Sequence, residues 1–300
     1  MKKIVVITSG GDAPGMNAAL YGVVKKATEH HVAVYGAKCG YIGIIEEDFV
    51  HLTIENTFPY LNQGGTRLET VRFPEFQEKK VQKKAIEIMK NHGFDALIVI
   101  GGDGSYKGAA KLSQLSFPVI AIPATIDNDI LGTDYSLGFS TAVSNAVNVI
   151  DKLRTTAASH GHIFVVEVMG RKAGHIAQKV GKAVGADMTI VPEVDFTIEQ
   201  VIESLNLSQK QKKKYSMIIT AEGAISCQDL SKAIEKNSQF KIHPLVLGHI
   251  QRGGDAAYED RILGTEFGES AVEFLLLKKD GLALGTKCGK IKGQTLLDYL

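Results

Sequence analysis

Cysteine and excess charge of either sign are both scarce in this chain. Only three cysteines occur among 300 residues, and they lie far apart at Cys39, Cys227 and Cys288. So few thiols, without the close spacings of a metal site, argue against a disulfide scaffold or a zinc module and fit a reducing compartment. Lysine plus arginine (34) and aspartate plus glutamate (33) leave a formal net charge of +1. This balance argues against a partner attracted by bulk charge, such as duplex DNA or an anionic membrane surface.

Long hydrophobic runs are missing as well. The longest apolar stretches, such as Ala96–Ile100, are far shorter than the ~20 residues that span a bilayer. The apolar run Ile4–Ile7 ends in Ser-Gly-Gly-Asp and is too short for a secretory signal. We therefore expect a cytoplasmic protein whose partners include neither a membrane nor nucleic acid.

Apolar residues nevertheless make up 44% of the chain, enough to build a large core. Continuous apolar runs rich in β-branched residues predict strands buried on both faces of a parallel sheet. Such runs occur at 3–8, 32–35, 96–100, 117–122, 163–168, 189–191 and 216–220. Helical patterns lie between them at 17–28, 80–92, 141–154, 173–184 and 198–205. The alternation predicts a doubly wound α/β fold, and the break at 135–140 is a candidate domain boundary.

Two glycine-rich turns each follow a predicted strand, Ser9–Gly15 (SGGDAPG) and Gly101–Ser105 (GGDGS). A strand, a glycine-rich turn and a helix start together direct backbone N–H groups at an anion. Neither turn has the G-x-G-x-x-G spacing and the chain has no GxxxxGK[ST], so a Rossmann dinucleotide site and a P-loop are disfavoured. One such turn is readily explained as a tight turn without function. Two of them, each with an aspartate, favour phosphate binding.

The segment Thr125–Asp129 (TIDND) follows another apolar run. In an extended segment alternate side chains point the same way, so we expect Asp127 and Asp129 to face one region beyond the strand end. Two carboxylates there suit one Mg²⁺ ligand and one general base that takes a hydroxyl proton. A turn rich in Asp and Asn, without function, is the alternative.

Four further side chains have the right chemistry for a phosphorylated sugar. Arg171 follows a predicted strand and can stabilise charge on a transferring phosphoryl group, although a surface arginine is the alternative. His249 and Arg252 precede a glycine pair and suit an anionic group. Glu222, just past another strand, can bond to sugar hydroxyls. The basic cluster at 209–214 (QKQKKK), taken alone, is typical of a solvated loop.

The chain as a whole resembles the bacterial ATP-dependent 6-phosphofructokinases. The resemblance covers nearly its full length and rests on six ordered motifs: SGGDAPGMNA at 9–18, RFPEF at 72–76, GGDGS at 101–105, TIDND at 125–129, VEVMGR at 166–171 and LGHIQRGG at 247–254. It implies two doubly wound, Rossmann-like α/β domains with the active-site cleft between them. The ATP-binding domain would comprise 1–138 plus 251–300, and the sugar-phosphate domain 139–250. It also implies a glycolytic kinase that assembles as a homotetramer, with sugar-phosphate sites completed by a neighbouring subunit.

The resemblance further implies a role for individual residues. The implied ATP site is Gly11, Tyr41, Arg72, Phe73, Gly102, Asp103, Gly104, Ser105 and Gly108, with Asp103 and Asp129 serving Mg²⁺. Asp127 would be the base that deprotonates the sugar 1-hydroxyl, supported by Thr125 and Arg171. The implied fructose 6-phosphate site is Thr125, Asp127, His162, Met169, Gly170, Arg171, Glu222, His243, His249 and Arg252.

The chain departs from the family pattern where the sugar phosphate is expected. His162 and His243 stand where arginines usually bind the 6-phosphate of the neighbouring subunit's substrate. Histidine titrates near ~6.5, so we expect weak sugar-phosphate affinity that improves at lower pH.

The family's effector site is also incomplete. Its phosphate and metal contacts are matched by Lys25, Arg154, Asp187, Lys213 and Lys214. Tyr21 and Ile54, however, replace residues that are usually arginine. We therefore expect weak or absent allosteric control.

The phosphoryl donor is indicated by two positions. Pyrophosphate-dependent relatives usually carry an acidic residue at the position of Gly104 and a lysine at that of Ala124. This chain has neither, which favours ATP, although ATP-dependent members usually have glycine at the latter position.

Three alternatives remain at this point. The first is a kinase for a related ketose phosphate, such as tagatose 6-phosphate or sedoheptulose 7-phosphate. The second is another kinase with a GGDG turn, such as an NAD kinase or a lipid kinase, which the TIDND, MGR and HIQRGG segments disfavour. The third is a non-catalytic nucleotide- or sugar-phosphate-binding paralogue, disfavoured by the presence of Asp103, Asp127, Asp129 and Arg171.

Overall fold

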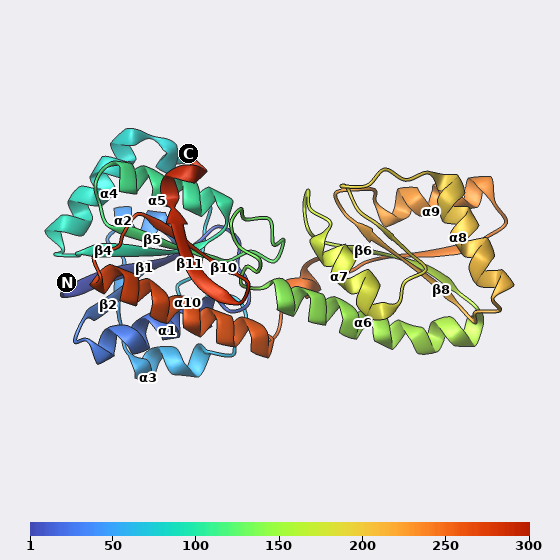
Figure 1. The fold of residues 1–300 in the computed structure, drawn as a ribbon, viewed down its shortest axis with the longest axis horizontal. Helices are drawn as coiled ribbons and strands as arrows, with labels where there is room; N and C mark the ends of the chain where they lie inside the picture. The colour runs from blue at the N-terminus through green and yellow to red at the C-terminus, as the bar shows by residue number, and fades with distance from the viewer. The chain divides into compact units, whose positions relative to one another are not determined.

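The computed structural model describes residues 1–300, which divide into two compact units (Figure 1). Unit 1 comprises Met1–Thr125, Ile130–Ser140 and Arg252–Leu300, and unit 2 comprises Ile126–Asp129 and Thr141–Gln251. The breaks at 140 and 251 lie within two residues of those predicted from the sequence. The four residues 126–129, which the sequence places in the first domain, belong to unit 2.

Unit 1 is built on a seven-stranded sheet with the order β11-β10-β5-β4-β1-β2-β3. The strands are β1 (Lys3–Ser9), β2 (Ala33–Ala37), β3 (Phe49–Leu52), β4 (Ala96–Gly101), β5 (Val119–Pro123), β10 (Leu282–Lys287) and β11 (Lys290–Thr295). The inner strands pair in parallel, and β3 and β11 pair antiparallel at the two edges. The predicted strands in this unit are all present, whereas β3, β10 and β11 were not predicted.

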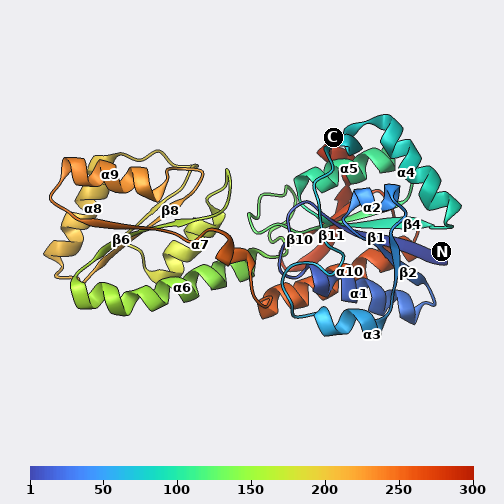
Figure 2. The ribbon, with the colours of Figure 1, turned by 180° about the vertical axis from the view of Figure 1, so that it is seen from behind.

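Helices cover both faces of this sheet (Figure 2), because the side chains on both faces of its inner strands are apolar. Ile4 and Val6 pack in one core with α1 (Met16–Glu29) and α10 (Tyr258–Leu276). The intervening residue Val5 packs in the other core, beneath the helices of the opposite layer. That layer is α2 (Tyr41–Ile45), α4 (Lys79–Asn91) and α5 (Asp103–Gln114), while α3 (Ile54–Thr57) contacts α1. The doubly wound arrangement therefore follows from the period-2 direction of strand side chains.

Unit 2 is a four-stranded parallel sheet with the order β7-β8-β6-β9. The strands are β6 (Ile163–Val168), β7 (Met188–Ile190), β8 (Ser216–Ala221) and β9 (Ile242–Val246). The helices are α6 (Phe139–His160), α7 (His175–Val184), α8 (Ile198–Lys210) and α9 (Cys227–Asn237). Figures 1 and 2 show α8 and α9 over one face of the sheet and α6 and α7 over the other. No helix in either unit combines the length and the apolar character needed to cross a membrane.

Candidate active site

The carboxyl ends of three neighbouring parallel strands in unit 1 carry the predicted phosphate-binding segments. Ser9 on β1 pairs with Gly101 on β4, which in turn pairs with Pro123 on β5. A side chain at Gly101 would place a Cβ atom 2.4 Å from the Ser9 carbonyl oxygen, so only glycine permits this approach. The two glycine-rich turns and Thr125 therefore meet at one edge of the sheet, where open α/β sheets bind ligands.

The start of α5 is suited to an anion. Gly102 is its N-cap residue, so no side chain there accepts hydrogen bonds from the first N–H groups of the helix. An added Cβ at Gly104 would meet no atom within 4 Å, so the space beside the helix start is open. Unpaired N–H groups and the helix dipole make such an end favourable for phosphate. The predicted succession of strand, glycine-rich turn and helix is present here.

Several predicted ATP-site residues bond to or pack against the start of α5. The buried Tyr41 donates its hydroxyl to the Ser105 carbonyl at 2.8 Å, and its ring packs so closely that a Cβ at Gly108 would lie 2.9 Å away. Burial raises the pKa of the Tyr41 hydroxyl well above its ordinary value. Ser105 donates its own hydroxyl to the Ser9 carbonyl at 3.0 Å. These side chains hold the two turns together.

Three other predicted residues of unit 1 present polar groups at its surface. Arg72 is exposed, next to the partly buried Phe73. The Asp103 carboxylate is 56% exposed and lies 2.7 Å from the Lys107 ammonium. Arg252 donates a guanidinium N–H to the Asp12 carbonyl at 2.7 Å, which places it on the first glycine-rich turn.

The carboxyl ends of the unit 2 strands form a second cluster. Met169–Arg171 follows β6, Glu222 follows β8, and His249 follows β9, all on adjacent parallel strands. The Glu222 carboxylate accepts hydrogen bonds from the backbone N–H groups of Gly170 at 3.2 Å and Arg171 at 2.8 Å. Arg171 has a left-handed backbone with φ 52°, a conformation disfavoured for residues other than glycine. Glu222 thus stabilises the turn that contains Arg171.

Arg171 forms an ion pair with Asp127, the predicted base. The Arg171 Nε atom lies 3.3 Å from an Asp127 carboxylate oxygen, and the two side chains are 54% and 1% exposed. His175, at the start of α7, has its Nδ1 atom 3.3 Å from the Asp127 carbonyl oxygen. A buried carboxylate beside an exposed cation is a suitable arrangement for deprotonating a hydroxyl next to a developing negative charge.

The prediction that the segment Thr125–Asp129 is extended is wrong. Ile126 and Asp127 form a turn and Asn128 is left-handed with φ 53°, so the segment is not extended and the alternation rule does not apply. Asp127 is buried, whereas Asp129 is exposed. No group of three or more His, Cys, Asp or Glu side chains is arranged to hold a metal ion. A nucleotide-bound Mg²⁺ needs only one or two carboxylates, because phosphate and water supply the other oxygens. Asp103 in unit 1 and Asp129 in unit 2 are each exposed.

His162 and His243 lie at the opposite end of the unit 2 sheet from Arg171. His162 directly precedes β6 and His243 is near the start of β9, so a strand of roughly 20 Å separates them from the residues after its carboxyl end. Their ring centroids are 4.0 Å apart, and His160 stacks on His162 at 5.1 Å. Local burial, followed by the neighbouring imidazoles, lowers the pKa of His162. Within one chain these histidines do not join the cluster at the carboxyl ends.

The comparison with known proteins identifies the family. The sequence matches the family model described as Phosphofructokinase over residues 3–275. The chain belongs to the phosphofructokinase family. It is 45% identical over 300 residues to the proteins named ATP-dependent 6-phosphofructokinase of Bacillus thuringiensis (strain Al Hakam) and Bacillus anthracis (strain A0248), covering 100% of this chain and 94% of each relative.

Solved phosphofructokinases confirm the fold. The Saccharomyces cerevisiae structure matches with a TM-score of 0.92 at 31% identity, over 100% of this chain and 45% of that longer chain. A pyrophosphate-dependent phosphofructokinase from Marinobacter aquaeolei matches with a TM-score of 0.89 over 100% of this chain and 84% of its own. At 24% identity, the second likeness shows the fold alone.

Four of the five predicted effector residues of this phosphofructokinase form internal bonds. Asp187 accepts hydrogen bonds from Lys213, from a serine hydroxyl and from a backbone N–H. Burial opposes its ionisation, but these bonds outweigh burial and lower the pKa of Asp187. Arg154 donates to the Val184 carbonyl, Lys214 is exposed, and Lys25 in unit 1 pairs with a glutamate of α10 at 2.6 Å. Unit 2 thus brings Asp187 and Lys213 together.

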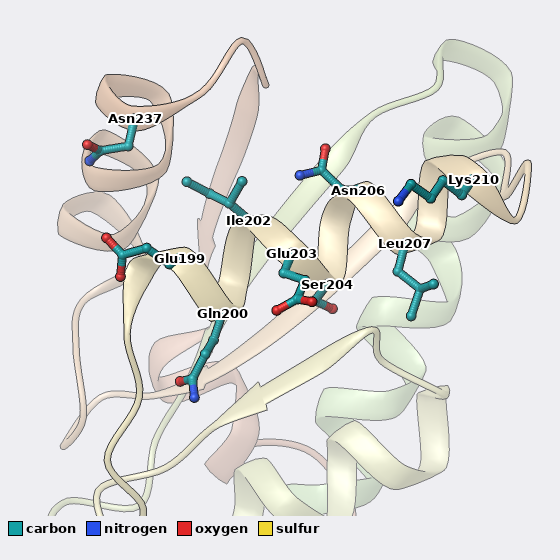
Figure 3. Close-up of a pocket in the computed structure, with 9 residues that line it drawn as sticks. All are labelled: Glu199, Gln200, Ile202, Glu203, Ser204, Asn206, Leu207, Lys210 and Asn237. Atoms are coloured by element: carbon teal, nitrogen blue, oxygen red, sulfur yellow. The ribbon is translucent and has the colours of Figure 1, made fainter.

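A surface pocket of about 740 Å³ lies elsewhere on unit 2, over α8 and the end of α9 (Figure 3). Its lining residues are Glu199, Gln200, Ile202, Glu203, Ser204, Asn206, Leu207, Lys210 and Asn237. None of them is a predicted site residue.

Two residues near the site were not predicted from the sequence. His175 contacts the backbone of Asp127, and the fully buried Gln251 bonds to the backbone next to Gly170. Both contacts join segments distant in the chain, and only the position of Gln251 within the HIQRGG motif hinted at a role.

Proposed function

We propose that the protein is an ATP-dependent 6-phosphofructokinase, which phosphorylates the 1-hydroxyl of fructose 6-phosphate in glycolysis. The observation that carries the proposal is the buried Asp127 carboxylate, 3.3 Å from the Nε atom of the exposed Arg171. The names of relatives that are 45% identical over the whole chain support the same reaction.

Unit 1 binds the donor. The open start of α5 at Gly102–Gly104 and the turn at Gly10–Gly11 bind the ATP phosphates, to which their backbone N–H groups donate hydrogen bonds. The exposed Arg72 and the partly buried Phe73 contribute to the nucleotide site. When bound, Mg²⁺ neutralises charge on the β- and γ-phosphate oxygens, and Asp103 and Asp129 would hold it.

Unit 2 carries the acid–base chemistry. The Asp127 carboxylate takes the proton from the sugar 1-hydroxyl as that oxygen bonds to the γ-phosphorus, and the bond to the β–γ bridging oxygen breaks to release ADP. Arg171 stabilises the negative charge on the transferring phosphoryl group, and Thr125 supports it. Met169, Gly170, Glu222 and His249 of this unit hold the sugar phosphate, together with Arg252 of unit 1.

The assembly is part of the proposal. His162 and His243 lie at the far end of the unit 2 sheet from Arg171. That position supports a role in the site of a neighbouring subunit, which a homotetramer provides.

The test is ADP formation by purified protein with Mg-ATP and a titration of fructose 6-phosphate. Asp127→Asn keeps the shape of the side chain but removes the base, and we expect kcat to fall by a factor of ~10²–10⁴. Asp280→Asn, at an exposed aspartate of unit 1, is the matched control and is expected to retain wild-type kcat. No turnover by the wild type at saturating fructose 6-phosphate would contradict the proposal.

A second candidate is a kinase for another ketose phosphate. The observation that favours it is the histidine pair at positions where the family resemblance leads one to expect arginine. Tagatose 6-phosphate and sedoheptulose 7-phosphate are therefore assayed in parallel, and a higher kcat/KM for either would select this candidate. Nucleotide binding without turnover on any of these sugars would indicate a non-catalytic paralogue.

A further inference from the structure

Gln251 is a polar side chain of unit 2 with no exposed surface. It lies in the short helix Gly248–Arg252, two residues after His249. A buried amide is costly unless its donors and acceptor are hydrogen-bonded. The partners of this side chain therefore indicate what it does.

The Gln251 amide connects two loops of the sugar-phosphate cluster. Its Nε2 atom donates to the Gly248 carbonyl at 3.0 Å, and its Oε1 atom accepts from the Met169 N–H at 3.4 Å. One side chain thus ties the turn after β9, which carries His249, to the residue that follows β6.

A second side chain holds the same turn from another element. Asn145, on α6, donates its Nδ2 group to the carbonyl oxygens of Gln251 at 3.2 Å and Ile250 at 3.5 Å. The Gln251 side chain therefore bonds this turn to the loop after β6, and the Asn145 side chain bonds it to α6.

We propose that Gln251 is a positioning residue, which holds His249 at a fixed position relative to Met169 and Gly170 before the sugar phosphate binds. The inference rests on the proposed function. The uncharged amide of Gln251 donates to one carbonyl and accepts from one N–H with a single terminal group. Glutamate has no donor for Gly248, and methionine, of similar length, has neither a strong donor nor a strong acceptor.

The experiment compares Gln251→Met and Gln251→Glu with wild type in steady-state kinetics. We expect the KM for fructose 6-phosphate to rise about tenfold, which corresponds to about 1.4 kcal/mol. The kcat value and the KM for ATP should stay within about twofold, because the base and the donor site are untouched. Gln239→Met, at an exposed glutamine of unit 2, is the matched control and should change none of these constants.

A double-mutant cycle separates positioning from general stability. If Gln251 acts through His249, the effects of Gln251→Met and His249→Ala on the KM for fructose 6-phosphate are less than additive. Full additivity, or an unchanged KM in both Gln251 variants, would overturn the inference. If the Gln251 variants fail to fold, Asn145→Ala is measured instead, and an unchanged KM for fructose 6-phosphate in Asn145→Ala would also overturn the inference. Absence of turnover in the wild type would instead refute the proposed function, and this inference with it.

Discussion

Gly101 is the position at which a single methyl group should disturb both glycine-rich turns. A Cβ atom there would lie 2.4 Å from the Ser9 carbonyl oxygen and 2.6 Å from the Ser105 hydroxyl oxygen. Neither neighbour can easily give way, because Ser9 pairs with Gly101 in the sheet and the Ser105 hydroxyl is bonded to Ser9. Overpacking of a well-packed core costs about 1–3 kcal/mol.

The expected result of Gly101→Ala is therefore a lower Tm. At roughly 2–4 °C per kcal/mol for a unit of this size, the decrease should be roughly 2–12 °C. The KM for ATP should rise as well, since the two turns are forced apart. Thermal unfolding followed by circular dichroism measures the first effect, and steady-state kinetics measures the second.

The matched control for stability is Gly104→Ala, three residues further along the same segment. A Cβ there meets no atom within 4 Å, and Gly104 lies in the first turn of α5. Alanine favours the helix over glycine by up to ~1 kcal/mol, so the Tm should be equal to or higher than that of wild type. A Gly101→Ala protein with wild-type Tm would refute the reasoning.

Two further predictions concern unit 2. Glu222→Leu should lower kcat about tenfold or more, because the Arg171 N–H loses its charged acceptor. Glu222→Gln keeps an oxygen that can accept this bond and should lower kcat less. Steady-state kinetics of both variants tests this role, and equal losses of kcat would contradict it. Since the pKa of His162 is lowered, its charge is gained only as pH falls below about 6.5. The KM for fructose 6-phosphate should therefore decrease from pH 8 to pH 6, and His162→Arg should lower the KM at pH 8 and flatten that dependence. A KM independent of pH in the wild type would exclude the imidazole from phosphate binding.

Local patterns in the sequence were sufficient to predict the framework of the site. The runs before Gly10 and Gly101 are apolar and β-branched, so strand, turn and helix were predicted where they occur. β9 was not predicted, because it contains Pro244 and a histidine, which are tolerated at the edge of a sheet. α10 was not predicted because its glycines interrupt the helical pattern, although they allow it to pack closely on α1.

The chemistry at the site was predicted as a set of residues but not as an arrangement. The segment around Asp127 was wrongly predicted to be extended, because no spacing rule specifies the turn at Ile126 and Asp127 or the left-handed backbone of Asn128. The bonds from Gly170 and Arg171 to Glu222 join residues 50 or more positions apart. Such contacts depend on the order of strands in the sheet, which single-sequence periodicity does not determine.

The discontinuous course of unit 1 has a consequence for its biosynthesis. The face of β1, β4 and β5 packs against α10, which begins only at Tyr258, so a ribosome finishes unit 2 before this covering helix emerges. At ~5–20 residues per second, the part of this apolar face that α10 covers stays exposed for on the order of ten seconds. During that interval the nascent chain should depend on chaperones more than a protein whose domains are made one after another.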